Sequence, residues 1–327
     1  MRARIRIIGL MGIAALVLAT PALAAPEAPV MLAPGEQPPN NDPPPPVGGG
    51  QWPASPNEVG LTSDRCPNWN SVKTSRGGFD VTQDGATLSN LEVSGQISVK
   101  AKNVTLRCVR TTGGRYGIAC GGSSAPGCSG LVVEDSEIRN ASSAGVLFFG
   151  GNSVLRRSHV HDNVDGVKIT SSGNTVEDSY IHDLRDNDGK CHCDGIQYRG
   201  GSNNTFRRNY ISGRRAADSP YKANSNATSA TINQAADGSI SRFTVEDNLF
   251  DGGGFGMYLT KKSTCTTCSM SNVHVRRNRF VPGSFSHGPL STNVSWSSAC
   301  LVWEGNAYLN GSSIGTPGGA RSSGSCF

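Results

Sequence analysis

The sequence predicts an all-β protein built as a solenoid, in which about eight coils stack along one axis. Three observations support this fold class: a short segment recurs eight times, a charge within it alternates in sign from copy to copy, and 41 of the 327 residues are Gly. Hydrophobic residues make up 36% and aromatic residues 6% of the chain. That composition is usual for a β protein rich in Gly, Ser and Asn, and it is low in hydrophobic residues for a helical enzyme.

Residues 1–24 have the features of a secretory signal peptide. A segment with three arginines precedes an apolar stretch at 7–19, and a small-residue cleavage motif follows at 22–24. The apolar stretch is too short for a membrane anchor, and no later run reaches the length of a spanning helix. Residues 25–50 read as a Pro-rich tether. We therefore expect a secreted protein without membrane insertion, with one folded domain at residues 51–327.

Ten cysteines are present, and none lies in the first 65 residues. In the oxidising compartment that export implies, they are most simply five disulfides. The alternative is metal binding, because CHC at 191–193 and CTTC at 265–268 have spacings similar to those of zinc ligands. We do not expect Cys191 to pair with Cys193, and the rest of the connectivity stays open.

The repeated segment has an apolar residue, a charged residue, one or two polar residues and a second apolar residue. Its eight copies are LRCVR (106–110), VEDSEI (133–138), LRRSHV (155–160), VEDSYI (176–181), FRRNYI (206–211), VEDNLF (245–250), VRRNRF (275–280) and WEGNAY (303–308). The charge alternates without a break through Arg107, Glu134, Arg156, Glu177, Arg207, Glu246, Arg276 and Glu304. In the middle six copies the next position alternates as well, through Asp135, Arg157, Asp178, Arg208, Asp247 and Arg277.

Copies that recur every 21 to 39 residues cannot bury their apolar faces alone, so they must stack on one another. Stacked parallel strands bring equivalent residues to about 4.8 Å from each other. Alternating charges then attract both neighbours, whereas like charges would repel along the whole column. The Ser/Asn position that follows suits a turn, because a short polar side chain there can bond the backbone and the next copy. A second strand per coil appears as GIAC (117–120), GVLFF (145–149), DGVKI (165–169), DGIQY (194–198) and GMYL (256–259).

Across roughly residues 80–310 these copies resemble the right-handed parallel β-helix proteins of the pectate-lyase-like superfamily. The resemblance implies a right-handed parallel β-helix, and it points to polysaccharide lyases and polygalacturonase-like glycoside hydrolases. Residues 80–110 can add one further turn, and residues 311–327 read as a disulfide-tied cap. Because some such helices are only scaffolds, the fold alone does not establish catalysis.

The two largest enlargements of the repeat lie between residues 177 and 207 and between 207 and 246. Loops that grow from one face of adjacent coils build a groove for an extended polymer. NVDGVKI at 163–169 and HCDGIQY at 192–198 are the same element on consecutive coils. We therefore expect Asp165 beside Asp194 and Lys168 beside Gln197.

Two carboxylates stacked about 5 Å apart share a proton, bind a cation such as Ca²⁺, or act as an acid/base pair. Strand parity places Asp165 on the interior side with Val167 and Ile169, unless the strand begins after it. The structural alternative is that Asp165 and Asp194 only hold a turn before a Gly.

NVDG is similar to the Asn-Thr-Asp-Gly motif of polygalacturonases, whose Asp is catalytic. This resemblance implies that Asp165 is a catalytic carboxylate with Asp194 as its partner. The paired Asp-Asp, the Gly-His-Gly and the Arg-Ile-Lys of that family are absent, and SHG at 286–288 is a partial match. The related β-helix lyases use a Lys or Arg base, with Ca²⁺ or a side chain neutralising a uronate.

The leading functional hypothesis is a secreted enzyme that cleaves an acidic, uronate-containing polysaccharide by β-elimination. Its predicted catalytic residues are Asp165, Asp194, Lys168, Arg185, Lys190 and His192. Asp165 and Asp194 are also the candidate Ca²⁺ ligands, Lys168 or Lys190 the base, and Arg185 or His192 would assist. The predicted substrate-binding residues are Gln197, His182, Tyr198, Arg199, Arg215 and Tyr221.

Two other functions are consistent with the sequence. One is a glycoside hydrolase that uses the Asp pair as acid and base, and the other is a non-catalytic glycan-binding or surface-structural β-helix. The first 50 residues carry three basic and three acidic residues, so the formal charge of +5 belongs to the folded domain and favours an acidic glycan. Nucleic-acid binding is not expected, since the bases alternate with acids instead of forming a stripe. We expect a monomer.

Overall fold

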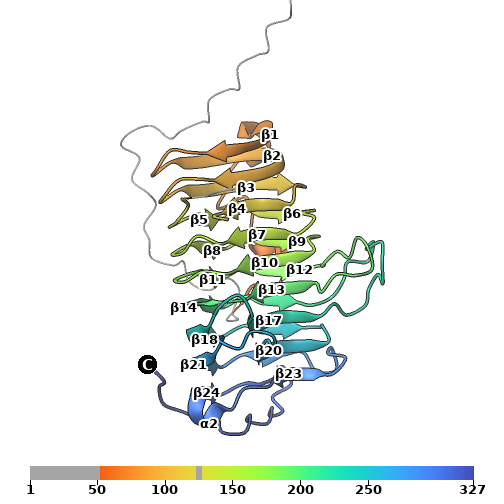
Figure 1. The fold of residues 1–327 in the computed structure, drawn as a ribbon. Helices are drawn as coiled ribbons and strands as arrows, with labels where there is room; N and C mark the ends of the chain where they lie inside the picture. Colours follow the sequence, from red (N-terminus) through yellow and green to blue (C-terminus); the bar gives the residue numbers. More distant parts are fainter. Residues whose placement is uncertain (1–51, 123–126) are drawn as a thin grey trace, which may run out of the picture.

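The computed structural model describes residues 52–122 and 127–327, so the predicted signal peptide and tether lie outside the described residues. In the described part, the chain winds through parallel strands that stack along one axis, with successive coils running from β1 (Thr74–Val81) at one end to β25 (Ala307–Tyr308) at the other (Figure 1). All strand pairings between neighbouring coils are parallel, and they confirm the predicted parallel β-helix. Among the described residues, helices are limited to η1 (Pro56–Glu58), α1 (Trp69–Val72) and α2 (Trp296–Ala299).

The strands form three faces of the solenoid. The first face follows β2 (Thr87–Val99), β3 (Thr105–Thr112), β5 (Val132–Glu134), β8 (Val154–Arg156), β11 (Thr175–Glu177), β15 (Thr205–Arg207), β18 (Ile240–Glu246), β21 (Met270–Arg276) and β24 (Leu301–Glu304). The short β14 (Gly201–Ser202) pairs with the beginning of β18. The second face continues from β3 into β6 (Glu137–Arg139), β9 (His159–His161), β12 (Tyr180–His182), β16 (Tyr210–Ser212), β19 (Leu249–Asp251), β22 (Arg279–Phe280) and β25.

The third face continues from β2 into β4 (Tyr116–Cys120), β7 (Ala144–Phe148), β10 (Asp165–Ile169), β13 (Asp194–Tyr198), β17 (Ser229–Ala235), β20 (Phe255–Lys261) and β23 (Gly288–Thr292). The eight sequence copies coincide with the strand pairs of the first and second faces, and the second-strand segments coincide with the third face. The apolar positions of each copy point inward and form continuous buried columns. One such column contains Leu106, Val133, Leu155, Val176, Phe206, Val245, Val275 and Trp303.

A tight turn joins the first face to the second in each coil. The alternating Asp and Arg residues at this turn adopt a left-handed backbone, with φ between 49° and 57° in the middle six copies. The following Ser or Asn is buried and bonds the adjacent coil, as predicted. For example, the backbone amide of Asn209 donates to Asn248 Oδ1 at 3.0 Å, and that of Asn248 donates to Asn278 Oδ1 at 3.0 Å. These side chains satisfy backbone groups that a turn would otherwise leave unpaired inside the protein.

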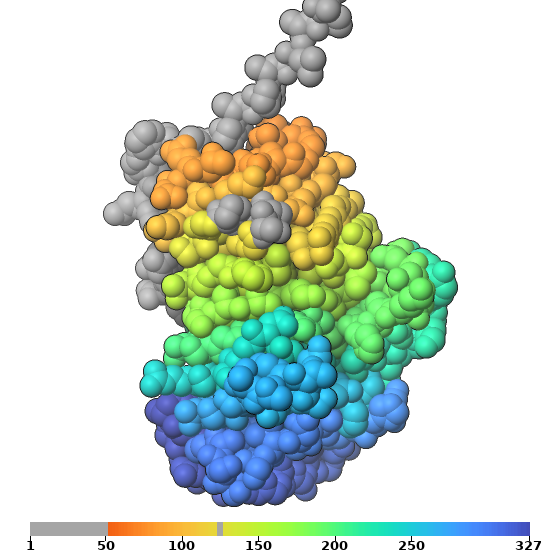
Figure 2. Space-filling model, in the orientation of Figure 1, coloured from red at the N-terminus to blue at the C-terminus, as the bar shows by residue number. Residues whose placement is uncertain are grey.

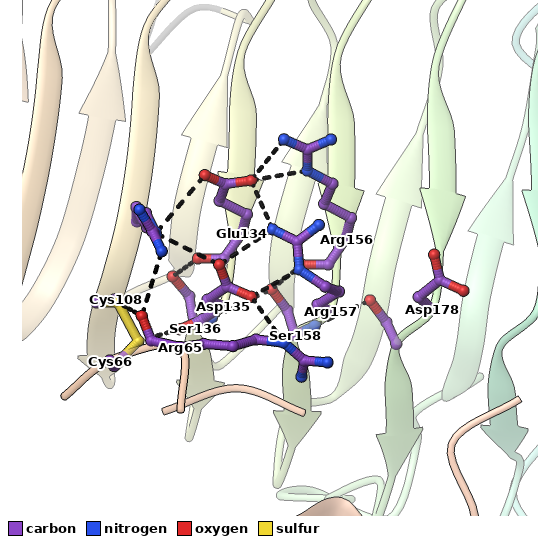
Figure 3. Close-up of polar contacts among 12 residues, drawn as sticks. Arg65, Cys66, Cys108, Glu134, Asp135, Ser136, Arg156, Arg157, Ser158 and Asp178 are labelled. Carbon is purple, nitrogen blue, oxygen red and sulfur yellow. Dashed lines mark hydrogen bonds and ion pairs between the residues drawn. A yellow bond between two sulfur atoms is a disulfide. The ribbon is translucent and has the colours of Figure 1, made fainter. Parts of the chain in front are cut away.

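Alternating charges on neighbouring coils form ion pairs (Figure 3). Arg157 bonds Asp135 through Nε at 2.7 Å and also reaches Glu134 at 2.8 Å, while Arg156 lies 2.7 Å from Glu134. Because equivalent residues stack, a single reversal of charge would place like charges beside each other. This column of ion pairs, called the ion-pair ladder below, therefore has a structural role, and it agrees with the alternation in the sequence.

An N-terminal segment lies along the outside of this ladder. Cys66 is disulfide-bonded to Cys108, and the indole of Trp69 donates to the Cys108 carbonyl at 2.8 Å. Arg65 lies 3.7 Å from the buried Asp135 (Figure 3). These contacts hold the segment against the turn between the first two faces.

Every cysteine is in a disulfide, and all ten lie among the described residues. The pairs are Cys66–Cys108, Cys120–Cys128, Cys191–Cys193, Cys265–Cys268 and Cys300–Cys326. The prediction that Cys191 does not pair with Cys193 is wrong, because the chain turns between them and brings their Cα atoms to 5.1 Å, within disulfide range. Because these cysteines are all in disulfides, none is a free thiolate that could bind zinc at 191–193 or 265–268.

Two long connections project together from the side of the solenoid, between β12 and β13 and between β16 and β17 (Figure 1, Figure 2). Arg185 bonds Asp218 at 2.6 Å, and Arg215 lies 3.4 Å from Asp186, so ion pairs join the two connections. They correspond to the two largest enlargements of the repeat.

Candidate functional site

Asp165 and Asp194 begin two neighbouring strands of the third face, β10 and β13. Lys168 pairs with Gln197 in the same ladder, as the sequence predicts. The two aspartates are in contact, because the backbone amide of Asp194 donates to Asp165 Oδ1 at 3.0 Å. The stacking expected from the repeated DG dipeptide is therefore present in the structure.

The Asp pair lies on the outer side of the sheet. A Cβ on Gly166 would lie only 2.5 Å from Cγ2 of the buried Ile181, so Gly166 points inward. Asp165 precedes it and approaches Lys168, whose Nζ lies 3.9 Å from Asp165 Oδ2. The prediction that the Asp165 side chain shares the interior side with Val167 is wrong. Gly166 and Val167 both face the interior, and this interrupts the strand alternation between Asp165 and Val167.

The pair is nearly sealed from solvent. Asp194 is 0% exposed and Asp165 is 5% exposed. The Ser229 hydroxyl donates to Asp194 Oδ1 at 2.5 Å, and Gln197 Nε2 donates to its Oδ2 at 3.4 Å. Gln197 thus covers Asp194 from the outside and is itself only 9% exposed.

Burial raises the pKa of both carboxyls. The pKa of Asp165 rises to about 6, with Lys168 and the Asp194 amide partly opposing the effect. The pKa of Asp194 rises well above its usual range through burial and, next, through the charge of Asp165. Two buried carboxylates cannot both ionise cheaply, so burial and the neighbouring charge favour the protonated form of this pair.

Calcium does not fit this donor set. Ca²⁺ takes roughly six to eight oxygen ligands, whereas three of the four carboxylate oxygens here already accept hydrogen bonds. The fourth, Asp165 Oδ2, faces the Lys168 ammonium, which would repel a cation. Asp186, Cys191 and Cys193 lie close enough together to suggest another metal site, but their sulfurs are joined in a disulfide.

A cleft of about 750 Å³ runs over the outer side of the third face beside this pair. Lys168 is the one member of the predicted catalytic set that lines it. The cleft is lined by Gln96, Arg115, Tyr116, Gly121, Gly122, Gly127, Cys128, Leu147, Phe149, Gly150, Lys168, Thr170 and Asp237. Lys168 is therefore the group through which the buried Asp pair can act on a bound molecule.

The other predicted catalytic residues lie away from the Asp pair. Arg185 is held by Asp218 at 2.6 Å and approaches Asp162 at 3.7 Å. Lys190 and His192 are exposed on the projecting connection. The structure does not bring these three side chains to Lys168, because the insert that carries them folds outward from the coil instead of over it.

Besides Gln197, two further predicted substrate-binding residues are buried. Tyr198 is 0% exposed, packs against Phe206 in the core and donates its hydroxyl to the Gly201 carbonyl at 2.6 Å. Arg215 is 7% exposed and bonds the carbonyl of Asn226. Strand alternation turns Tyr198 inward, and the projecting connection encloses Arg215, so neither side chain is open to solvent in this structure; their predicted role stays a prediction.

The remaining substrate-binding candidates are spread over different surfaces. Arg199 lies on the outer side of the third face and bonds Asp237 twice, at 2.6 and 2.8 Å. Tyr221 is 45% exposed on the projecting connection, where a Cβ on Gly189 would touch its ring at 3.2 Å. Of this set, Gln197 and Arg199 are on the third face with Lys168.

His182 is on the second face, in a cluster with His159 and His161. Nε2 of His182 and Nε2 of His159 lie 2.7 Å apart, and the His161 ring stacks on His159 with centroids at 4.0 Å. Burial lowers the pKa of His159 to about 3. Burial opposes the charge of His161 as well, but hydrogen bonds to Asp162 and Glu137 raise its pKa. His182 therefore lies on the second face, away from the third-face strands that carry the Asp pair, and its predicted role in substrate binding stays a prediction.

Sequence reasoning missed several residues on the outer side of the third face. Phe149 is 55% exposed in the cleft, and Arg115 lies over the Tyr116 ring at 5.4 Å. The signal for Phe149 was available, since it follows the buried Phe148 and alternation turns the next side chain outward. Farther along the same face, Phe255 packs against Tyr258 and against His287, which belongs to the SHG segment.

The family model for a right-handed β-helix region matches residues 74–313. The chain belongs to the right-handed β-helix family. A search among curated proteins finds no significant relative.

Several solved structures are similar to this chain at low identity. An alginate lyase from a Paenibacillus species is 12% identical, with 77% of this chain and 81% of that chain covered and a TM-score of 0.50. A pectate lyase is 13% identical over 77% and 68% of the two chains, with a TM-score of 0.43. The A-module of a mannuronan C-5 epimerase from Azotobacter vinelandii is 14% identical over 70% and 71%, with a TM-score of 0.39. At such identities the similarity shows the fold alone, so the function of this β-helix must be argued from its own side chains.

Proposed function

We propose that this β-helix is a secreted enzyme that cleaves an acidic polysaccharide by β-elimination at Lys168. The observation that carries the proposal is the position of the Lys168 amino group: it lines the cleft and is backed, 3.9 Å from its Nζ, by a buried carboxyl pair. A cleft beside titratable groups with shifted pKa values is the usual setting of an active site.

β-Elimination in a uronate needs a base for the C5 proton, an acid for the leaving oxygen, and a positive group near the carboxylate. Lys168, as the free amine, would take the C5 proton; the electron pair forms the C4–C5 double bond, and the C4–O bond breaks. The leaving oxygen takes a proton from solvent water in the cleft, and Lys168 returns the C5 proton to solvent after the product leaves, which restores the free amine. Arg115 is exposed at the cleft wall and supplies a positive group for the uronate.

The Asp pair would act on the reaction through Lys168. Asp165 orients the side chain of Lys168, and Ser229 and Gln197 fix Asp194 behind it. The buried pair is rigid because each carboxyl is bonded to a neighbouring strand. Such support holds a reacting group in one geometry and lowers the entropic cost of the reaction.

A second candidate is a glycoside hydrolase, and the raised pKa values of the Asp pair favour it. A carboxyl with a raised pKa is a suitable general acid. In this alternative Asp194 would donate the proton and Asp165 would be its partner. The near-complete burial of both groups counts against direct contact with a glycosidic oxygen.

A product assay distinguishes these functions. We would incubate the protein with a panel of uronate and neutral polysaccharides, then measure ultraviolet absorbance and product mass. The proposal expects an unsaturated, absorbing product from a uronate polymer. Products that have gained water and do not absorb would establish the hydrolase instead. Tight binding of a polymer without any product would indicate a non-catalytic glycan-binding β-helix.

Secretion is part of the proposal. Five disulfides fit an oxidising compartment. Among the described residues, none of the helices has the length and apolar character required to cross a bilayer. Fractionation of producing cells would test it, with the protein expected outside the cytoplasm.

A further inference from the structure

We propose that His159 and His182 form a structural zinc site, in which the Nε2 atoms of both imidazoles bind the ion and tie two neighbouring coils together. The site is on the second face, whereas Lys168 and the Asp pair are on the third, so the inference is independent of the proposed function. Histidine is the commonest metal ligand in proteins, and neutral imidazole suits Zn²⁺.

The strand register places the two imidazoles on adjacent coils. Tyr180 pairs with His159 and His182 pairs with His161, so His159 and His182 occupy diagonal positions on β9 and β12. Their Nε2 atoms lie 2.7 Å apart, and their ring planes differ by only 5°, with centroids 5.0 Å apart. The two rings therefore meet tip to tip, and both Nε2 atoms are directed at the same point.

A carboxylate fixes the orientation and the protonation of His182. Its Nδ1 lies 2.9 Å from Asp183 Oδ2, and this nitrogen carries a hydrogen, because an ionised carboxylate can only accept a hydrogen bond. Nε2 of the neutral imidazole is then a lone pair aimed at His159. Metal-binding histidines almost always have such a partner on the second ring nitrogen, which fixes the tautomer and makes the ligand nitrogen more basic.

The same His-Asp pair recurs on the preceding coil. Nδ1 of His161 lies 2.6 Å from Asp162 Oδ2, and both aspartates have a left-handed backbone, with φ of 55° at Asp162 and 49° at Asp183. In this turn each carboxylate lies beside the imidazole of the preceding residue. Nε2 of His161 approaches Glu137 at 3.4 Å and is therefore engaged elsewhere. The His161 ring stacks on His159 with centroids at 4.0 Å, so it positions that ligand.

A small opening of the imidazole pair makes room for the ion. Zn–N bonds are about 2.0–2.1 Å long, so two nitrogens on a tetrahedral ion are separated by roughly 3.3 Å. The present 2.7 Å suits one shared hydrogen, and the ring tips must separate by about 0.6 Å. The His182 side chain is 17% exposed, so solvent reaches it and its ring can move outward. Water would occupy the remaining coordination positions.

Bound zinc would strengthen the base of the projecting connections. His182 is the last residue of β12, and the connection to β13 begins at Asp183. The imidazole pair joins this point to β9 on the neighbouring coil. An ion that binds the folded protein, and not the separated histidines of the unfolded chain, raises the free energy of unfolding.

Zinc titration of chelator-treated protein tests the site. Calorimetry should show one Zn²⁺ per chain, and excess Ca²⁺ should not displace it, since hard cations prefer oxygen ligands. His159→Gln and His182→Gln should each lower the affinity at least tenfold. Asp183→Asn, which leaves both ligands in place, should lower it about tenfold or more. His287→Gln is the matched control, an exposed histidine before β23, and should keep full affinity.

Thermal unfolding separates zinc binding from a loss of folding. Zinc should raise the unfolding midpoint of the unaltered protein and of His287→Gln, and should leave that of the two ligand variants unchanged. The Asp183 side chain is 49% exposed, so Asp183→Asn should keep the unaltered midpoint in chelator. If a ligand variant does not fold, Asp183→Asn decides, and full affinity in that variant overturns the site. No zinc binding, full affinity in both ligand variants, an equal loss in His287→Gln, or displacement by Ca²⁺ would each overturn it.

Discussion

The backbone amide of Asp194 donates to the carboxylate of Asp165 on the preceding coil at 3.0 Å. This bond ties the beginning of β13 to the beginning of β10, below the surface that carries Lys168. It also explains why two acids tolerate each other inside the protein: one is partly satisfied by the backbone of the next coil, and the other by Ser229.

The Asp pair should make stability fall as pH rises. Burial raises the pKa of Asp165 to about 6 in the folded state, above the ordinary value of 3.8 for Asp, so the native protein binds the proton more tightly than the unfolded chain. The stabilisation is present below pH about 4 and is lost as pH rises through about 6. Urea denaturation should show that Asp165→Asn weakens this pH dependence, since Asp194 still titrates, and gains on the order of 1–3 kcal/mol relative to the unaltered protein at neutral pH. An unchanged pH profile in the variant would contradict this assignment.

Removal of the Lys168 amine should abolish elimination without unfolding the protein. Lys168 is on the outer side of β10, and its side chain keeps 27% exposure, so Lys168→Gln loses little packing. We expect at least a hundredfold loss of product formation, consistent with the removal of a general base. Lys190→Gln, on the projecting connection, is the matched control and should keep full activity. The midpoint of thermal unfolding should be the same for all three proteins.

The ion-pair ladder should contribute more to stability where it is buried. The Arg157 side chain is 10% exposed between Glu134 and Asp135, whereas the Arg277 side chain, at the equivalent position, is 46% exposed. Removing one partner of a buried pair leaves an uncompensated charge, and costs about 3–5 kcal/mol, against about 0–1 kcal/mol for an exposed pair. Urea unfolding of Arg157→Ala and Arg277→Ala should differ accordingly. Equal losses would show that burial does not control this ladder.

The Asn ladder should tolerate Ser better than Ala. Asn248 is 0% exposed, accepts the amide of Asn209 through Oδ1, and donates to the carbonyl of Phe206 at 2.9 Å. Asn248→Ala leaves buried backbone groups unpaired and should cost about 2–4 kcal/mol. Asn248→Ser should lose less, since Ser occupies this position in the copies that contain Ser136, Ser158 and Ser179 and accepts the same amide bond. Chemical denaturation of the two variants checks the order.

Chelation should leave any lyase activity intact. The carboxylate oxygens of the Asp pair are engaged by protein donors, and Lys168 faces the remaining one. We expect equal rates with and without EDTA, measured as the appearance of unsaturated product. A loss that is restored by added Ca²⁺ would show that the Asp pair opens to a cation.

The sequence predicted the coils because each coil repeats the same contacts with its neighbours. Alternation of Arg and Glu at positions such as 156 and 177 is needed only if copies stack at strand spacing, so the pattern carries three-dimensional information. The stacking of Asp165 on Asp194 followed for the same reason. By contrast, the Cys191–Cys193 disulfide and the positions of Arg185 and His192 depend on an insert without a repeat. No periodicity constrains such a segment, and its direction is set by ion pairs such as Arg185–Asp218.

By itself, the sequence determined the stacked architecture, the charge and Asn ladders, and the pairing of two carboxyls beside a lysine. These features follow from repetition alone, because each residue contacts the equivalent residue in the next copy of the repeat. The tertiary structure decided which of the candidate groups meet solvent in one cleft. Gly166 interrupts the strand alternation and turns Asp165 toward Lys168, while alternation buries Tyr198 and the projecting connections carry Lys190 and His192 away. Side-chain direction depends on such single-residue irregularities, and they became visible only once the coils were packed.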